Sequence, residues 1–91
     1  MFLIRVELHD AKYTDYETLH SEMAQRSFSR KVTSSDGTVY HLPTAEYYYN
    51  GTGTSDQVLN SAKAAANATG KTSGVIVADA TQLKWNGLTK A

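Results

Sequence analysis

Residues 1–8 read Met-Phe-Leu-Ile-Arg-Val-Glu-Leu, and this stretch decides the fold. Every even position is apolar, whereas positions 5 and 7 are charged. A period of two residues is typical of a β-strand with one buried face and one wetter face. The stretch therefore predicts a strand whose even face packs on the core and whose other face, which carries Arg5, stays open.

Two helices are predicted on either side of a central β-rich region. Thr14 and Glu17 have the spacing of a capping box, so the first helix should start there, and an apolar stripe at helical spacing follows it (Tyr16, Leu19, Met23). Thr54 and Gln57 repeat that spacing before a second helix from about residue 55 to 69. Gly70 then stands where a left-handed C-cap belongs.

The region between the helices predicts a hairpin. Asp36-Gly37 is a strong signal for a two-residue turn in which both residues have positive φ. Strands are expected over residues 29–34 and 38–49, with a bulge at Pro43 because proline lacks a ladder donor. A last strand is predicted over residues 74–78. It is followed by a polar tail from about residue 79 in which Trp85 should cover the core.

The order strand, helix, strand, strand, helix, strand predicts one α+β domain over residues 1–91. The arrangement expected is ferredoxin-like βαββαβ, a four-stranded antiparallel sheet with two helices on one face. Nine basic residues balance nine acidic ones, so no protein-wide field attracts nucleic acid. There are no cysteines and no apolar run of membrane-spanning length. We expect a cytoplasmic protein without membrane, metal or cofactor.

A local cationic patch is the first candidate for RNA binding. Arg26, Arg30 and Lys31 lie within six residues and have no acid among them. Cations there could contact phosphates, or they could simply protect an exposed strand edge. Arg5 and Tyr48 are further candidates, because an open sheet face holds single-stranded RNA by aromatic stacking beside basic side chains.

Histidines are the candidates for acid–base catalysis. His9 follows the first strand and His41 follows the hairpin turn, so strand pairing could bring the two rings together. One could then take a proton from a ribose hydroxyl while the other protonates the leaving oxygen. The alternative is that both are ordinary exposed side chains, and His20 is expected to be peripheral. Asp10 directly follows His9.

Three stretches carry a resemblance to a known family: residues 1–8, the Leu-Pro-Thr-Ala-Glu-Tyr run at 42–47, and the alanine-rich run at 62–66 with Thr-Gly-Lys at 69–71. The chain resembles GhoS-like endoribonuclease antitoxins of type V toxin–antitoxin systems, which are related to Cas2-like ferredoxin-fold nucleases. The likeness spans nearly the whole chain and rests on structural motifs. Cas2-like proteins place a metal-binding aspartate near the end of the first strand, close to the position of Asp10.

The resemblance implies an RNA-binding endoribonuclease that cleaves a toxin messenger RNA. It gives no residue-by-residue catalytic signature. The competing hypothesis is a protein-binding module without chemistry, for instance a prophage or phage inhibitor of a host complex. The partner expected is thus single-stranded messenger RNA or another protein, and the chain could be a monomer or a homodimer.

Overall fold

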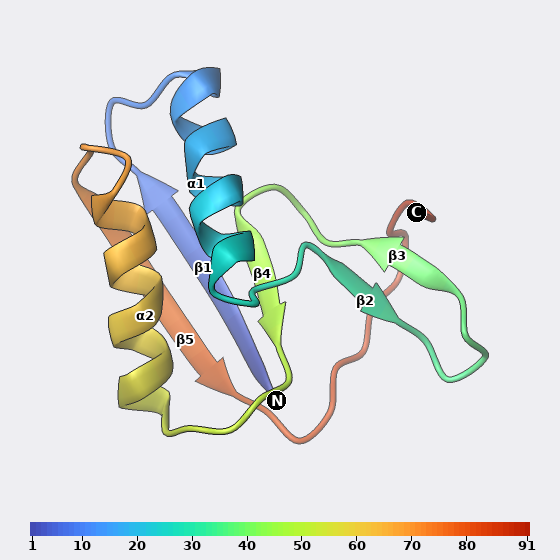
Figure 1. Ribbon diagram of the computed structural model, residues 1–91. Helices are drawn as coiled ribbons and strands as arrows, with labels where there is room; N and C mark the ends of the chain where they lie inside the picture. Colours follow the sequence, from blue (N-terminus) through green and yellow to red (C-terminus); the bar gives the residue numbers. More distant parts are fainter.

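A computed structural model describes residues 1–91, and it has an α+β architecture. The elements follow in the order β1 (Phe2–Leu8), α1 (Tyr13–Gln25), β2 (Lys31–Thr33), β3 (Val39–His41), β4 (Glu46–Tyr49), α2 (Ser55–Asn67) and β5 (Ser73–Asp79). One antiparallel sheet has the strand order β4-β1-β5, and β2 and β3 form a separate hairpin. Both helices cover the same face of the larger sheet, and the hairpin projects away from it (Figure 1).

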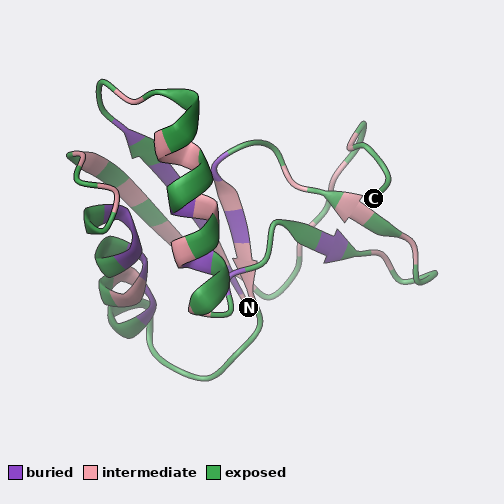
Figure 2. Cartoon of the chain, turned by 45° about the horizontal axis from the view of Figure 1, so that its top comes forward, coloured by how far each residue is buried: buried purple, intermediate pink, exposed green.

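The predicted alternation in β1 is confirmed. Its even-numbered residues are at most 6% exposed (Phe2, Ile4, Val6, Leu8), whereas Arg5 and Glu7 are exposed. β1 is the central strand, with β4 and β5 on its two sides. The buried face of β1 packs under the helices, and Figure 2 shows most of the buried positions between helices and sheet, with a further buried position, Val32, on β2 of the hairpin.

The core extends from β1 to both helices and to β4. Leu19 and Met23 of α1 and Val58 and Ala62 of α2 are buried, as the helical stripes predict. Phe28, Tyr47, Ala65 and Ala66 complete the cluster. Val75 and Val77 of β5 pack against this core but are only half-buried. The reason is that β5 is an edge strand with a neighbour on one side only.

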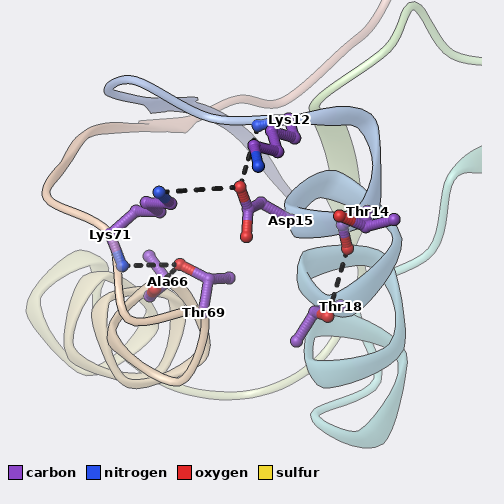
Figure 3. Close-up of polar contacts among 7 residues, drawn as sticks. All are labelled: Lys12, Thr14, Asp15, Thr18, Ala66, Thr69 and Lys71. Atoms are coloured by element: carbon purple, nitrogen blue, oxygen red, sulfur yellow. Dashed lines mark hydrogen bonds and ion pairs between the residues drawn. The ribbon is translucent and has the colours of Figure 1, made fainter.

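The capping box of α2 is confirmed, but that of α1 lies two residues earlier than predicted. Thr54 Oγ1 accepts from the Gln57 N–H at 3.2 Å, and Gln57 Oε1 accepts from the Thr54 N–H at 2.9 Å. In α1 it is Asp15 whose carboxylate accepts from the Lys12 N–H, at 2.8 Å. That carboxylate also lies 3.8 Å from Lys71 Nζ, which joins the start of α1 to the loop after α2 (Figure 3).

The sheet has three strands, not the four expected, although the order of elements roughly fits the ferredoxin-like pattern. The predicted long returning strand is broken at Pro43, because Ala45 adopts φ 67° and turns the chain between β3 and β4. The fourth strand is reduced to Ser29, which exchanges two backbone hydrogen bonds of 2.8 Å with Tyr48. After that contact the chain leaves the sheet and continues into β2.

The tip of the hairpin is a three-residue loop, so the prediction of a two-residue turn is wrong. The Ser34 N–H donates to the Thr38 carbonyl at 2.8 Å, and the Gly37 N–H donates to the Ser34 carbonyl at 3.0 Å. Gly37 has φ 86° as expected, whereas Asp36 does not have positive φ. Asp36 instead accepts from the Ser34 hydroxyl and the Thr38 N–H, and these bonds lower its pKa to about 2.

The polar tail that follows β5 is ordered along the hairpin. Lys90 forms a β-bridge with Tyr40, and the Thr89 carbonyl accepts from the His41 N–H at 2.8 Å. Trp85 packs edge-on against Tyr40, with ring centroids 5.8 Å apart. Trp85 therefore lies beside the hairpin. The prediction that it covers the main core is wrong.

Replacing Gly37 by alanine should lower the free energy of unfolding by about 1 kcal/mol. No atom lies within 4 Å of the position that a Cβ would take, so the loss comes from the left-handed backbone alone. Gly74→Ala is the matched control, because Gly74 also has open space around it but sits in β5 without positive φ. Urea unfolding of both variants measures the difference. Equal stabilities would refute the strained-turn account.

Candidate nucleic-acid interface

A groove with a volume of about 700 Å³ lies where the hairpin leaves the three-stranded sheet. One side is the chain from Ser29 to Ser35, which includes β2. The second is the C-terminal segment from Thr81 to Trp85, and Met1 and Tyr48 contribute from the end of the sheet. Thirteen residues line the groove and none of them is acidic. In a chain with equal numbers of acids and bases, this is a local departure towards positive charge.

The groove combines cations with aromatic rings. Lys31 and Lys84 are both exposed, one on the hairpin side and one on the C-terminal side. Tyr48 and Trp85 are half-buried, so part of each ring is accessible. Most of the other lining side chains are hydroxyl-bearing (Ser29, Thr33, Ser34, Ser35, Thr81). Ammonium, hydroxyl and aromatic groups together can contact the phosphates, sugars and base faces of a single strand.

Tyr48 faces the open side of the sheet because of the register of β4. Tyr47 pairs with Ile4 on the buried face, so the next residue, Tyr48, pairs with Leu3 on the other face. The two hydrogen bonds to Ser29 then fix the backbone on which the Tyr48 ring is mounted. Arg5 lies one row away on the same open face, where it is the direct neighbour of Glu46.

The three clustered cations do not share one surface. Arg26 is half-buried and pairs with Glu22, with 3.1 Å between Nη1 and Oε1. Lys31 begins β2, and Arg30 lies in the bend just before it. Lys31 lines the groove, whereas Arg30 lies on the side of α1, where its charge acts on His20 and Tyr47. Only Lys31 of this patch belongs to the groove.

His9 and His41 lie in different parts of the fold, after the end of β1 and in the hairpin, respectively. His9 follows β1, where its Nδ1 is 3.0 Å from the Thr72 hydroxyl and its Nε2 is 3.5 Å from Glu7. Asp10 follows it in an exposed turn with φ 50°. His41 is the cross-strand partner of Lys31 in the hairpin, so it lies on the same face of that hairpin as a groove residue. The structure therefore pairs His41 with a groove residue, although His41 does not itself line the groove, and His9 has no such neighbour.

His20 was predicted to be peripheral, but it contacts a buried side chain. Its Nδ1 lies 2.6 Å from the hydroxyl of Tyr47, and Tyr47 is fully buried. Burial lowers the pKa of His20, and the positive charge of Arg30 adds to this effect. Burial also raises the pKa of Tyr47. The neutral imidazole thus satisfies a hydroxyl that would otherwise be buried without a partner.

Among the lining residues, sequence reasoning named only Lys31 and Tyr48 as site candidates; it did not consider Lys84, and it assigned Trp85 to the core. The signal for them is weak, a cation next to an aromatic residue in a segment without periodicity. For His20, the signal is its position beside Leu19 and four residues after Tyr16, at the margin of the apolar stripe of α1.

No group of three or more His, Asp or Glu side chains that could hold a metal ion is present. Neither helix combines the length and the apolar character that crossing a membrane requires. Comparisons of this chain with protein-family models, with curated proteins and with solved structures gave no match.

Proposed function

We propose that this protein binds single-stranded RNA in the groove between the hairpin, the end of the sheet and the C-terminal segment. The observation that carries the proposal is the composition of the groove: two exposed lysines and two aromatic rings, with no acidic side chain. Stacking on aromatic rings tolerates any base, and each ammonium–phosphate contact releases counterions from the RNA. The binding expected is therefore salt-dependent and only weakly sequence-selective.

The finer proposal is an endoribonuclease antitoxin with a ferredoxin-like fold, which the sequence resemblance suggests. The RNA would then be a toxin messenger. Cleavage without a metal needs a base to take the proton of the ribose 2′-hydroxyl as its oxygen attacks phosphorus. The bond from phosphorus to the 5′-oxygen breaks, and that oxygen takes up a proton. His41, the cross-strand neighbour of Lys31, is the histidine best placed to exchange a proton with RNA in the groove.

The double variant Lys31→Ala/Lys84→Ala tests RNA binding. Two lost phosphate contacts should flatten the slope of log affinity against log salt by up to about 1.4 units, because each contact to a single strand contributes roughly 0.7. Folding stability should hardly change, since both side chains are exposed and neither forms an ion pair. Fluorescence anisotropy of a labelled single-stranded RNA at several salt concentrations gives affinity and slope together.

The matched control is Lys12→Ala/Lys63→Ala, which removes the same charge from exposed positions outside the groove. It should keep the wild-type slope. If both double variants weaken binding equally, net charge and not the groove holds the RNA. If wild-type protein shows no affinity for RNA even at low salt, the proposal fails outright.

Cleavage is tested by comparing His41→Ala with His9→Ala. Both residues are exposed, but only His41 pairs with a groove residue, so only His41→Ala should lose cleavage of an end-labelled RNA while retaining RNA affinity. Equal losses would contradict the assignment of His41. Binding without cleavage by the wild-type protein would leave an RNA-binding protein that is not a nuclease.

A second candidate is a protein-binding module, such as a phage or prophage inhibitor of a host complex. The observation in its favour is the uncovered face of the larger sheet, where Ile76 is 68% exposed and Arg5 lies beside it. Apolar and cationic side chains on one open face suit a protein partner. Absence of RNA binding at low salt would favour this candidate.

A further inference from the structure

The edge of β5 leaves backbone hydrogen-bonding groups without partners. Met1 pairs with Ala80 and the His9 N–H donates to the Thr72 carbonyl, so the even-numbered residues of β5 direct their backbone groups towards β1. The odd-numbered residues direct theirs outwards (Ser73, Val75, Val77, Asp79). None of these outward groups has a backbone or side-chain partner.

This edge lacks the usual protection against pairing. Residues 73–78 contain no charge and no proline, and only Asp79 at the end of β5 is charged. Natural edge strands normally carry lysine, proline or a bulge, or are covered by another segment. The opposite edge of the same sheet follows that rule, because Ser29 covers part of β4. The β5 edge is thus a seven-residue template for another strand.

Two side-chain observations point the same way. Ile76 is 68% exposed at the centre of β5, and Val75 and Val77 are half-buried although they pack against the core. A strand added at this edge would cover all three. The occupant must supply a strand of matching length that places apolar residues opposite these positions.

We propose that the occupant is a second copy of this chain, paired antiparallel through β5 with the two-fold axis at Ile76. In this register Val75 faces the partner's Val77, Ser73 faces the partner's Asp79, and the two Ile76 side chains meet. The odd-numbered residues of each strand then form the hydrogen-bonded pairs, up to about eight bonds in all. Ile76 occupies a non-hydrogen-bonded pair, in which side chains approach most closely. The two Asp79 carboxylates lie at opposite ends, so like charges stay apart.

The paired residues of β5 do not line the groove, and Tyr48 and Ser29 lie at the other edge of the sheet. The groove segment from Thr81 to Trp85 follows β5, but the dimer is tested by mass, so dimer formation and RNA binding are measured independently. Sedimentation equilibrium of the whole chain should give twice the mass of one chain, and Ile76→Lys should reduce it to one chain by placing two ammonium groups together. Val39→Lys is the matched control, since Val39 is an exposed β-branched strand residue in β3. It should remain dimeric.

The register is tested by cysteine crosslinking, which is clean because the chain has no cysteine. Mild oxidation of Ile76→Cys should give a disulfide-linked dimer, since directly opposed residues of a non-hydrogen-bonded pair lie within disulfide reach. Ala78→Cys should not crosslink, because it faces the partner's Gly74. A wild-type chain that stays monomeric at every concentration, an Ile76→Lys variant that stays dimeric, or crosslinking of Ala78→Cys alone would each overturn the proposal.

Discussion

Truncation of Ile4 to alanine should destabilise the protein by about 2 to 5 kcal/mol. Ile4 is 0% exposed in the central strand, and both strands that flank β1 pair with it. Removal of three methyl or methylene groups there loses their transfer free energy and leaves a cavity that the rigid sheet cannot close. A chain of this length has about 5 to 14 kcal/mol of net stability, so the variant should lose a large share of it.

Val39→Ala is the control for this prediction. Val39 is 36% exposed in β3, and its substitution should change stability by less than about 0.5 kcal/mol. Denaturant unfolding followed by far-UV circular dichroism measures both variants. If Ile4→Ala were no less stable than Val39→Ala, the core described around β1 would be wrong.

Replacement of Tyr47 by alanine should lower the free energy of unfolding by about 3 to 5 kcal/mol, an effect as large as that of Ile4→Ala. Tyr47 is among the largest fully buried side chains, and its hydroxyl is bound to His20 at 2.6 Å. The alanine variant loses the ring and leaves His20 half-buried without that partner. Tyr47→Phe keeps the ring, so its free energy of unfolding should fall by only about 1 kcal/mol, the net contribution of one hydrogen bond. Thermal unfolding of the two variants separates the two contributions.

Tyr48→Ala is the matched control, because the adjacent tyrosine faces the groove and not the core. It should change stability much less than Tyr47→Ala, yet weaken RNA binding by about 1 to 3 kcal/mol if a base stacks on the ring. The reverse result, with Tyr48 important for folding and Tyr47 for binding, would show that the register of β4 is off by one residue.

The fold could be predicted where a pattern is local and repeats. Alternation in β1 and the apolar stripes of the helices gave the correct core, because burial on one face leaves a periodic record in the sequence. The loss of the predicted fourth strand could not be foreseen, since it depends on the left-handed Ala45 after Pro43 and on the exit of the chain from the sheet after Ser29. Both features depend on the tertiary structure, and neither produces a periodic pattern in the sequence.

The candidate site was only partly predictable for the same reason. Tyr48 and Lys31 were named from the sequence, and both line the groove. Lys84 and Trp85 were missed because the C-terminal segment has no periodic pattern, and its position depends on pairing between Lys90 and Tyr40. The expected meeting of His9 and His41 rested on strand pairing, which the separation of the hairpin from the larger sheet removes.

The fluorescence of Trp85 tests the RNA-binding groove most directly. It is the only tryptophan of the chain and it lines the groove, so its indole emission reports on that place alone. Titration with a single-stranded RNA at low salt should change this emission saturably, and added salt should reverse the change as phosphate contacts are lost. Unchanged Trp85 emission at low salt, whether RNA fails to bind or binds elsewhere, would contradict the account.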